Sequence, residues 1–447
     1  MAAICIPEEV DTTAQRVASA ALARATSGGA GQAEVVVTHD AGLSVSARMR
    51  DVETIESQDD RGFGVTVYCG QRKGSASTSD FSDAAIAAAV DKALYIASQT
   101  GADEYAGLAD ASLMATDFPD LALDHEWAID VEAAKAIALE TEAAALDADS
   151  RISNSEGASV STYRSHSVYA NSHGFTGCQR RSRHSISCAV IAGSGDQMER
   201  DYDYASARNP NALRPGVEVG AQASRRALAR LSPRKLSTRQ SPVVFRYDLA
   251  AGLIGNLLSA ISGGAQYRKA SYLLDAAGQR VLAPALSIHE RPHLAEGPGS
   301  TAFDAEGVAT ADRDIVTDGV LQGYVLSSYS ARRLGLQTTA NSGGVHNAIV
   351  SRGDGDLAHL LREMDEGLFV TEMMGQGVNA VTGDYSRGAA GFWVSGGEIA
   401  YPVSEITVAA NLKDMLANIV GVADDADAQS SIQAGSMLIE QMTIAGS

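Results

Sequence analysis

The sequence contains no apolar run long enough to cross a membrane. A membrane-spanning helix needs about 18 or more consecutive apolar residues, whereas the most apolar stretches, residues 84–90 and 143–146, are short, rich in alanine and bounded by Asp or Glu. The first residues, MAAICIPEEVD, lack both the basic segment and the apolar segment of a secretory signal. We therefore expect a cytoplasmic protein that makes no contact with membranes.

Cysteine is also scarce. Four cysteines (Cys5, Cys69, Cys178 and Cys188) in 447 residues do not make a disulfide framework, and none of them forms a C-x-x-C pair. We expect reduced and mostly buried thiols, which again favours a cytoplasmic location.

The chain has fewer basic than acidic residues. The 35 Lys and Arg residues are outnumbered by 55 Asp and Glu residues, which gives a net charge of −20. Such a surface repels phosphate, so nucleic acids are not expected as partners. One basic stretch, residues 225–239, contains six cations. We interpret it as a solvated helix end followed by a linker; contact with an acidic partner subunit is the alternative.

The hydrophobic pattern divides the chain into three predicted domains, 1–120, 121–235 and 236–447. In the first, helices at about 12–25 and 83–98 enclose short alternating runs, with turns near 40–42 and 70–74, which predict an antiparallel meander. The second repeats this order: a helix at 131–146, strand-like runs with a tight turn at 171–174, and a helix at 217–231. This repetition suggests a duplicated architecture.

The third domain is punctuated by glycine. A strand at 243–247 precedes a helix with an apolar face, and short strands are predicted at 307–309, 323–326, 368–371, 391–394, 398–402 and 405–409. The chain lacks a steady alternation of strand and helix. We therefore predict an α+β fold, with antiparallel and mixed sheets, flanking helices, an N-terminal region and a larger β-rich C-terminal domain.

One pentapeptide, His289-Glu290-Arg291-Pro292-His293, matches the zinc motif H-E-x-x-H. That motif works on a helix, which places both imidazoles on one face. Pro292 stands between the two histidines, and proline inside a helix costs about 3 kcal/mol or more. We therefore interpret the segment as a solvent-facing strand or loop.

A second segment, GDYSRGAAGFW at 383–393, surrounds one Asp and one Arg with small and aromatic residues. An exposed strand edge there could take an extended peptide by strand addition. A tight turn packed on a core Trp is the alternative.

The chain resembles the TldD/PmbA family, on the PmbA (TldE) side, over about residues 30–447. The matching stretches are RKGSAST (72–78), NSHG (171–174), MERDY (198–202), RLSPRKLST (230–238), YRK (267–269), FDAEGV (303–308), SYSARRLGL (328–336), MGQGVNAVTGDYSRGAAGFWV (374–394) and YPVSEITVAANLKDM (401–415). The resemblance implies a PmbA/TldD-like fold and cytoplasmic proteolysis. TldD-type and TldE-type subunits form a metalloprotease that cuts unfolded or flexible peptides, including modified-peptide precursors.

The resemblance also implies where zinc would lie. The TldD side carries HExxxH on a helix, together with a distant cysteine. The matching residues here, 253–261, read LIGNLLSAI, and no cysteine follows Cys188. We therefore expect no metal and no catalytic residue in this chain, with zinc held by a TldD-type partner.

The leading hypothesis is a metal-free, non-catalytic subunit that helps to present an extended peptide to the zinc subunit. The candidate substrate or partner contacts are Tyr267, Arg268, Lys269, His346, Asn347, Asp384, Tyr385 and Arg387. Two alternatives stay open: a stand-alone hydrolase that uses His289, Glu290 and His293 or another nucleophile, and a binding module without protease activity. A homodimer of the lone chain is also plausible.

Overall fold

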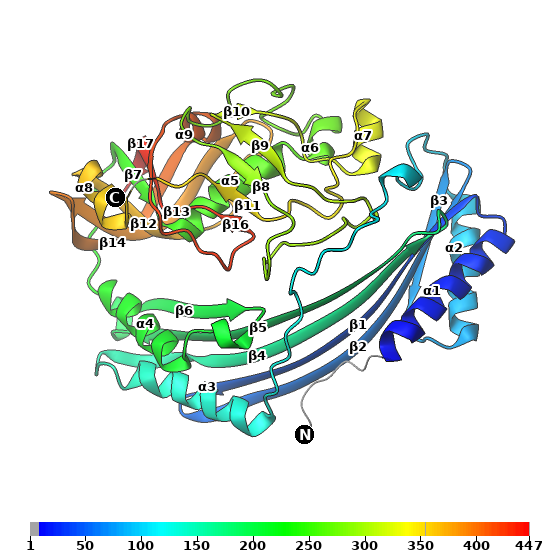
Figure 1. Ribbon diagram of the computed structural model, residues 1–447. Helices are drawn as coiled ribbons and strands as arrows, with labels where there is room; N and C mark the ends of the chain where they lie inside the picture. The colour runs from blue at the N-terminus through cyan, green and yellow to red at the C-terminus, as the bar shows by residue number, and fades with distance from the viewer. Residues whose placement is uncertain (1–8, 354, 447) are drawn as a thin grey trace. The chain divides into compact units, whose positions relative to one another are not determined.

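The chain folds as two compact units, and the computed structural model describes residues 9–353 and 355–446 (Figure 1). Unit 1 contains the residues up to Leu228 together with Ala302–Thr310. Unit 2 contains Ala229–Thr301 and the residues from Ala311 onward. The secondary structure is the α+β mixture that the sequence predicts.

Unit 1 is built on a 6-stranded sheet with the order β3-β2-β1-β4-β5-β6, in which all neighbours are antiparallel. Its strands are β1 (Gln32–Arg48), β2 (Asp51–Cys69), β3 (Arg72–Thr78), β4 (Ile152–Asn171), β5 (Thr176–Ala192) and β6 (Glu199–Ala207). Its helices are α1 (Glu9–Ser27), α2 (Asp83–Gln99), α3 (Val131–Leu146) and α4 (Gly216–Ala229).

The sheet has two similar halves. A helix, three strands and a helix (α1, β1–β3, α2) are followed by the same series (α3, β4–β6, α4), and the halves meet at the antiparallel pair β1–β4. The repeated order expected from the sequence is therefore present. The halves share one sheet, and the predicted boundary near residue 120 lies between them.

The helices of unit 1 cover one face of its sheet. Along β1, buried side chains fall on odd-numbered positions, from Ala33, Val35 and Val37 at one end to Val45 and Ala47 at the other. In Figure 1, α1 and α2 pack against one end of the sheet and α3 lies at the other. This period of two is what a sheet with one covered face requires.

The predicted turn at residues 40–42 does not form. Asp40 pairs with Asp60 on β2 and with Ser165 on β4, in the middle of strands that run unbroken through the predicted break. A ladder on both sides of β1 overrides the local turn preference of Asp and Gly. The short runs expected between 33 and 68 are thus two long strands, β1 and β2. Those expected between 159 and 170 are one strand, β4, and β6 was not predicted.

A short segment from the C-terminal half of the sequence, Ala302–Thr310, belongs to unit 1. We call it the tether. Phe303 packs edge-to-face on Phe175, with ring centroids 5.3 Å apart. The Ala115 amide donates to the Gly307 carbonyl at 3.0 Å. The strand predicted at 307–309 is wrong: the tether makes only isolated bridges, one from Val308 to Met114 and one within itself from Phe303 to Ala309.

Unit 2 contains a mixed 6-stranded sheet with the order β14-β13-β12-β7-β17-β15. An additional pairing of β14 with β17 closes all of these strands except β15 into a ring. The strands are β7 (Arg239–Phe245), β12 (Gly367–Met374), β13 (Asp384–Ser395), β14 (Glu398–Asn411), β15 (Ile419–Val422) and β17 (Met437–Ala445). The two strands predicted between 398 and 409 are one, β14, which β13 pairs along its length. The last strand of the chain lies between β7 and β14.

A second sheet of unit 2 is 5-stranded and small. It contains β8 (Ile288–Glu290), β9 (Arg313–Thr317), β10 (Val320–Leu321), β11 (Ala348–Val350) and β16 (Ile432–Gln433). The helices are α5 (Tyr247–Ala260), α6 (Gly263–Tyr267), α7 (Ser328–Leu334), α8 (Leu357–Met364) and α9 (Leu412–Ala417). The strand predicted at 323–326 is wrong; those residues lead into α7 and make one bridge, Ser262 with Val325.

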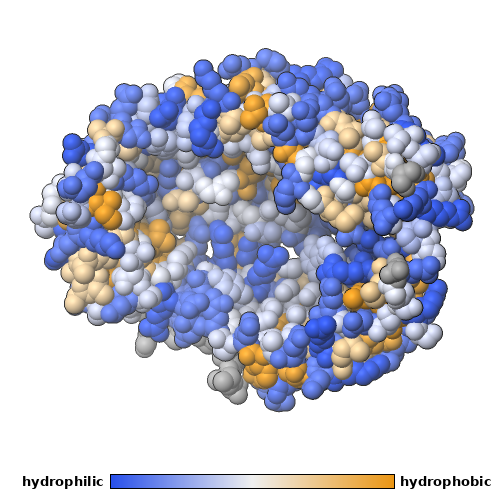
Figure 2. Space-filling model, turned by 180° about the vertical axis from the view of Figure 1, so that it is seen from behind, coloured by the Kyte–Doolittle hydropathy of each residue, from blue (hydrophilic) through white to orange (hydrophobic). Residues whose placement is uncertain are grey.

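The surface is mainly polar. Exposed large apolar side chains occur singly along the chain, and the face in Figure 2 shows hydrophilic residues with small apolar patches among them. In residues 9–353 and 355–446 no helix is long and apolar enough to cross a membrane. The division into three domains stays a prediction.

Candidate functional site

Helix α5 carries the residues that the resemblance aligns with a metal-binding helix. From Leu253 to Ala260 it offers no imidazole, thiolate or carboxylate. Leu253, Ile254 and Leu257 are fully buried in the main core of unit 2. The side-chain amide nitrogen of Asn256 donates to the Gly252 carbonyl one turn earlier, at 3.1 Å. Because zinc sites use His, Cys and carboxylate ligands, these residues do not fit a zinc ion.

The H-E-x-x-H pentapeptide forms no helix. Residues 288–290 are β8, so His289 and Glu290 point to opposite faces. The His289 Nδ1 atom lies 2.7 Å from an Asp314 carboxylate oxygen, and this hydrogen bond is the main cause that lowers the pKa of Asp314. The strand was predicted correctly, but Glu290 does not face solvent: it is 2% exposed.

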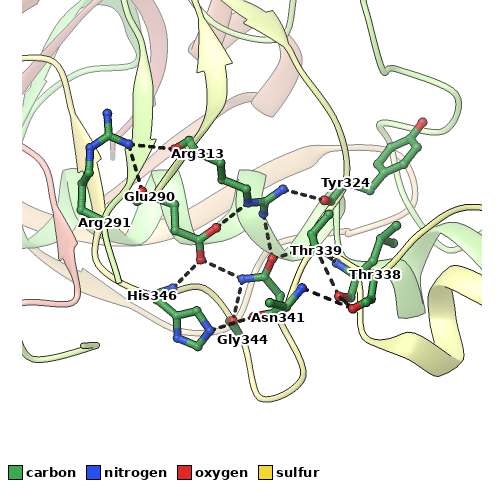
Figure 3. A network of polar contacts seen from close by, with 11 residues as sticks. Glu290, Arg291, Arg313, Tyr324, Thr338, Thr339, Asn341, Gly344 and His346 are labelled. Atoms are coloured by element: carbon green, nitrogen blue, oxygen red, sulfur yellow. Dashed lines mark hydrogen bonds and ion pairs between the residues drawn. The ribbon is translucent and has the colours of Figure 1, made fainter. Parts of the chain in front are cut away.

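Glu290 instead holds a buried polar network (Figure 3). One carboxylate oxygen accepts from the His346 amide and from the Asn341 side chain, both at 2.7 Å. The other accepts from Arg313 Nε at 2.6 Å. Arg313 also donates to the Tyr324 carbonyl at 3.1 Å and to Asn341 Oδ1 at 2.9 Å. The network fixes the loop that carries His346 against β8 and β9. No sequence pattern indicated this network.

Tyr267, Arg268 and Lys269 lie together at the end of α6. Arg268 is exposed and stacks over the Tyr267 ring, with the guanidinium carbon 5.2 Å from the ring centroid. Two residues of the SYSARRLGL stretch complete the group: Arg333 lies over the same ring at 5.0 Å, and Tyr329 meets it edge-on at 5.9 Å. We call these five residues the Tyr267 cluster. It is cationic and partly exposed, so it can meet a carboxylate.

His346 and Asn347 are held by the protein itself. Asn347 is fully buried; its amide nitrogen donates to the Arg291 carbonyl at 2.8 Å and to Ser300 Oγ at 2.7 Å, and its oxygen accepts from the Gly299 amide at 2.7 Å. His346 Nε2 lies 3.0 Å from the Ala340 carbonyl. Asn347 therefore shapes the loop from within.

Asp384, Tyr385 and Arg387 lie on β13. Arg387 Nε donates to the Gly375 carbonyl at 3.0 Å. Tyr385 is 3% exposed, and burial raises its pKa although Arg387 opposes this. Asp384 is exposed and accepts from Thr382 Oγ1 at 2.7 Å. Of the two alternatives, the exposed strand edge is not found. β14 pairs with one side of β13 from Asp384 onward, and β12 covers the other side from Gly388 onward. Before Gly388 that side bonds to residues 377–379, since the Ser386 amide donates to the Gly377 carbonyl.

Some of the candidates are connected through the backbone. The Tyr272 amide donates to the Ala380 carbonyl at 2.9 Å, which links the segment after α6 to the loop before β13. His346 and Asn347 belong to the loop held by Glu290. The exposed candidates are thus Arg268, Lys269 and Asp384.

The basic stretch 225–239 runs from unit 1 into unit 2, and its cations contact residues of the unit to which each belongs. Arg226 lies 3.0 Å from Asp203 in unit 1. In unit 2, Arg230 pairs with Glu372, Lys235 lies 3.2 Å from Glu405, and Arg239 stacks over a Trp ring. The stretch does join the end of α4 to β7, but Arg226 and Arg230 are largely buried in ion pairs instead of solvated, and Arg239 begins β7.

The sequence matches three family models. They are described as PmbA/TldA metallopeptidase domain 1, central domain and C-terminal domain, and they match residues 33–97, 124–231 and 238–446. The Haemophilus influenzae protein named Metalloprotease PmbA homolog is 51% identical over 433 residues, which are 97% of this chain and 96% of that protein. The chain belongs to the PmbA/TldD family.

Solved structures agree with this membership. A crystal structure from Bacteroides thetaiotaomicron is 27% identical with a TM-score of 0.92, and covers 99% of this chain and 100% of that one. TldE from Thermococcus kodakarensis is 18% identical with a TM-score of 0.80 over 95% of this chain and 99% of that one, and shares the fold. The PmbA/TldD-like fold expected from the sequence is confirmed.

Among the described residues of this family member, no group of three or more His, Cys, Asp or Glu side chains is arranged to hold a metal ion.

Proposed function

We propose that this chain is the non-catalytic subunit of a TldD/TldE-type metalloprotease, with zinc held by a TldD-type partner. The observation that supports this is the composition of α5, where aliphatic residues and one amide occupy the positions that the resemblance aligns with the metal helix. Water needs a metal or a base to become a nucleophile at neutral pH, and α5 supplies neither between Leu253 and Ala260.

The substrate in this proposal is an unfolded or flexible peptide, including a modified-peptide precursor. The Tyr267 cluster would bind peptide carboxylates, since Arg268 stands exposed on an aromatic support. Arg387 and Asn347 would act as positioning residues through the loops they hold. We place the complex in the cytoplasm; the free thiols of Cys69, Cys178 and Cys188 fit a reducing compartment.

The test combines metal analysis with peptidase assays. The purified chain is expected to hold no zinc and to leave an unfolded peptide intact. Mixed with a TldD-type subunit it is expected to give cleavage, and Arg268→Ala is expected to raise KM severalfold with little change in kcat. Glu398→Ala, another exposed site in unit 2, serves as the control. One zinc per lone chain, or cleavage by the lone chain that His289→Ala abolishes, would support the stand-alone hydrolase instead.

A further inference from the structure

The sheet of unit 1 has one long open edge. Strand β2 runs from Asp51 to Cys69, but β3 pairs only with Phe63–Cys69. Among the described residues, no strand pairs with the outer side of residues 51–62, which we call the open edge. In a β-strand every second residue directs its N–H and C=O groups away from the neighbour on one side. The open edge therefore presents unpaired backbone groups along its length.

The open edge is fixed in extended form at both ends. At the hairpin that leads into it, the buried carboxylate of Glu142 on α3 accepts from the Met49 amide at 2.8 Å and the Arg50 amide at 2.7 Å. At the other end, β3 pairs with Phe63 and the residues after it. Between them, pairing with β1 is continuous but for one bulge near Ala47. An edge fixed in extended form costs little entropy when another strand docks.

The other half of unit 1 shows what such an edge looks like when it is covered. Strand β6 pairs with β5 only from His184 onward, so residues 176–183 are the counterpart of the open edge. There the Ser182 amide donates to the Leu123 carbonyl at 2.9 Å, and Phe303 of the tether packs on Gly177. Extended segments of the same chain thus lie over one of the two edges. Nearly every residue of the open edge, by contrast, is exposed.

Charge selects the occupant. The open edge contains five carboxylates and one arginine: Asp51, Glu53, Glu56, Asp59, Asp60 and Arg61. Two copies paired about Glu56 would place Glu53 opposite Asp59, and like charges opposite each other destabilise a strand pair. A strand with Lys or Arg at alternate positions would meet opposite charge instead. The acidic side chains therefore disfavour pairing of two copies in this register and favour a basic strand.

We propose that the open edge docks a basic extended segment of a partner protein by strand addition. The partner strand would continue the line of β3 along residues 51–62. It would form backbone hydrogen bonds with the open edge and ion pairs with Glu53 and Glu56. This surface belongs to unit 1 and is independent of the Tyr267 cluster.

The test uses the full chain and a synthetic probe, a capped decapeptide of alternating Lys and Thr, at a fixed salt concentration. Amide hydrogen exchange is expected to slow at alternate residues of 51–62 when the probe is added. A probe N-methylated at every second residue keeps its charge but loses its donors, so at least about tenfold weaker binding is expected. Equal binding of both probes would overturn strand addition.

The matched variants separate this edge from the overall charge. Glu53→Lys/Glu56→Lys is expected to weaken probe binding by at least about tenfold. Glu104→Lys/Glu398→Lys changes the net charge equally at exposed sites that are not part of the open edge and is expected to keep most of the affinity. Equal losses in both double variants, protection outside residues 51–62, or a dimer that forms through this edge without the probe would each refute the proposal.

Discussion

At the scale of single residues, buried polar groups hold the functional loops, and the sequence showed little of this. The segment 288–290 was correctly predicted as extended. A strand of three residues is too short, however, for the alternation of apolar and polar residues to show which side chain is buried. Glu290 is buried because Arg313 and Asn341, 23 and 51 residues away in the sequence, supply its donors. A contact at that separation leaves no local pattern.

His184 provides a pH-dependent test at the same scale. It is fully buried, with Nδ1 2.9 Å from Thr162 Oγ1 and Nε2 2.8 Å from the His125 carbonyl. Burial is the main cause that lowers its pKa below the ordinary histidine value of about 6.5, while the His125 hydrogen bond opposes this. Below about pH 6.5 this histidine is protonated in the unfolded chain but stays neutral in the folded chain. The free energy of unfolding therefore falls as the pH drops through about 6.5.

His184→Gln is expected to reduce this loss of stability. The measurement is the urea midpoint at pH 7.5 and at pH 5.5, followed by the fluorescence of Trp127, whose ring centroid lies 5.5 Å from that of His184. The variant should lose less of its midpoint on acidification than the parent. His359→Gln, at a half-exposed site on α8, should lose as much as the parent. An equal loss in all three proteins would contradict the expectation.

At the scale of elements, the five longer helices, α1 to α5, were predicted, whereas the short helices α6 to α9 were not. The start of α2 was anticipated because Ser82 caps it locally, and its hydroxyl accepts from the Ala85 amide. The strands of unit 1 were divided too finely in the prediction. β1 is continuous because it pairs with β2 on one side and with β4 on the other, and β4 is far away in the sequence. Turn residues inside a strand that is paired on both sides mislead any local interpretation.

Two helical glycines give a matched test of packing between elements. A methyl group at Gly220 on α4 would lie 2.0 Å from the Thr141 carbonyl oxygen of α3, so Gly220→Ala is expected to cost about 1–3 kcal/mol. A methyl group at Gly252 on α5 meets nothing within 4 Å, and Gly252→Ala is expected to stabilise by up to about 1 kcal/mol. Chemical denaturation measures both, and a stabilised Gly220→Ala would refute the close crossing of α3 and α4.

At the scale of the whole molecule, neither unit is one continuous stretch of the sequence. The tether lies within the region matched by the C-terminal family model, yet it folds with unit 1. FDAEGV was visible as a motif, but nothing in the pattern could show which unit it joins. That is decided by Phe118 and Phe175, whose rings lie 5.8 Å and 5.3 Å from the Phe303 ring.

Phe303→Ala is therefore expected to loosen unit 1. Phe303 is 4% exposed, and truncation of a buried Phe typically costs about 3–5 kcal/mol. Amide exchange should accelerate in the β4–β5 hairpin while β12 and β13 keep their protection. Phe392→Ala, whose ring stacks on Phe369 in unit 2, should give the reverse pattern. Faster exchange confined to unit 2 in Phe303→Ala would show that the tether does not serve unit 1.

The position of β17 has a consequence for biosynthesis. This strand is the last in the chain, yet it pairs with β7, β14 and β15. While the ribosome still encloses β17, β7 and β14 have no strand to join them, and Val243 and Val244 lie beside a gap. Unit 2 therefore cannot complete this sheet before β17 has emerged, and a nascent chain stalled before Met437 would expose this seam to chaperones.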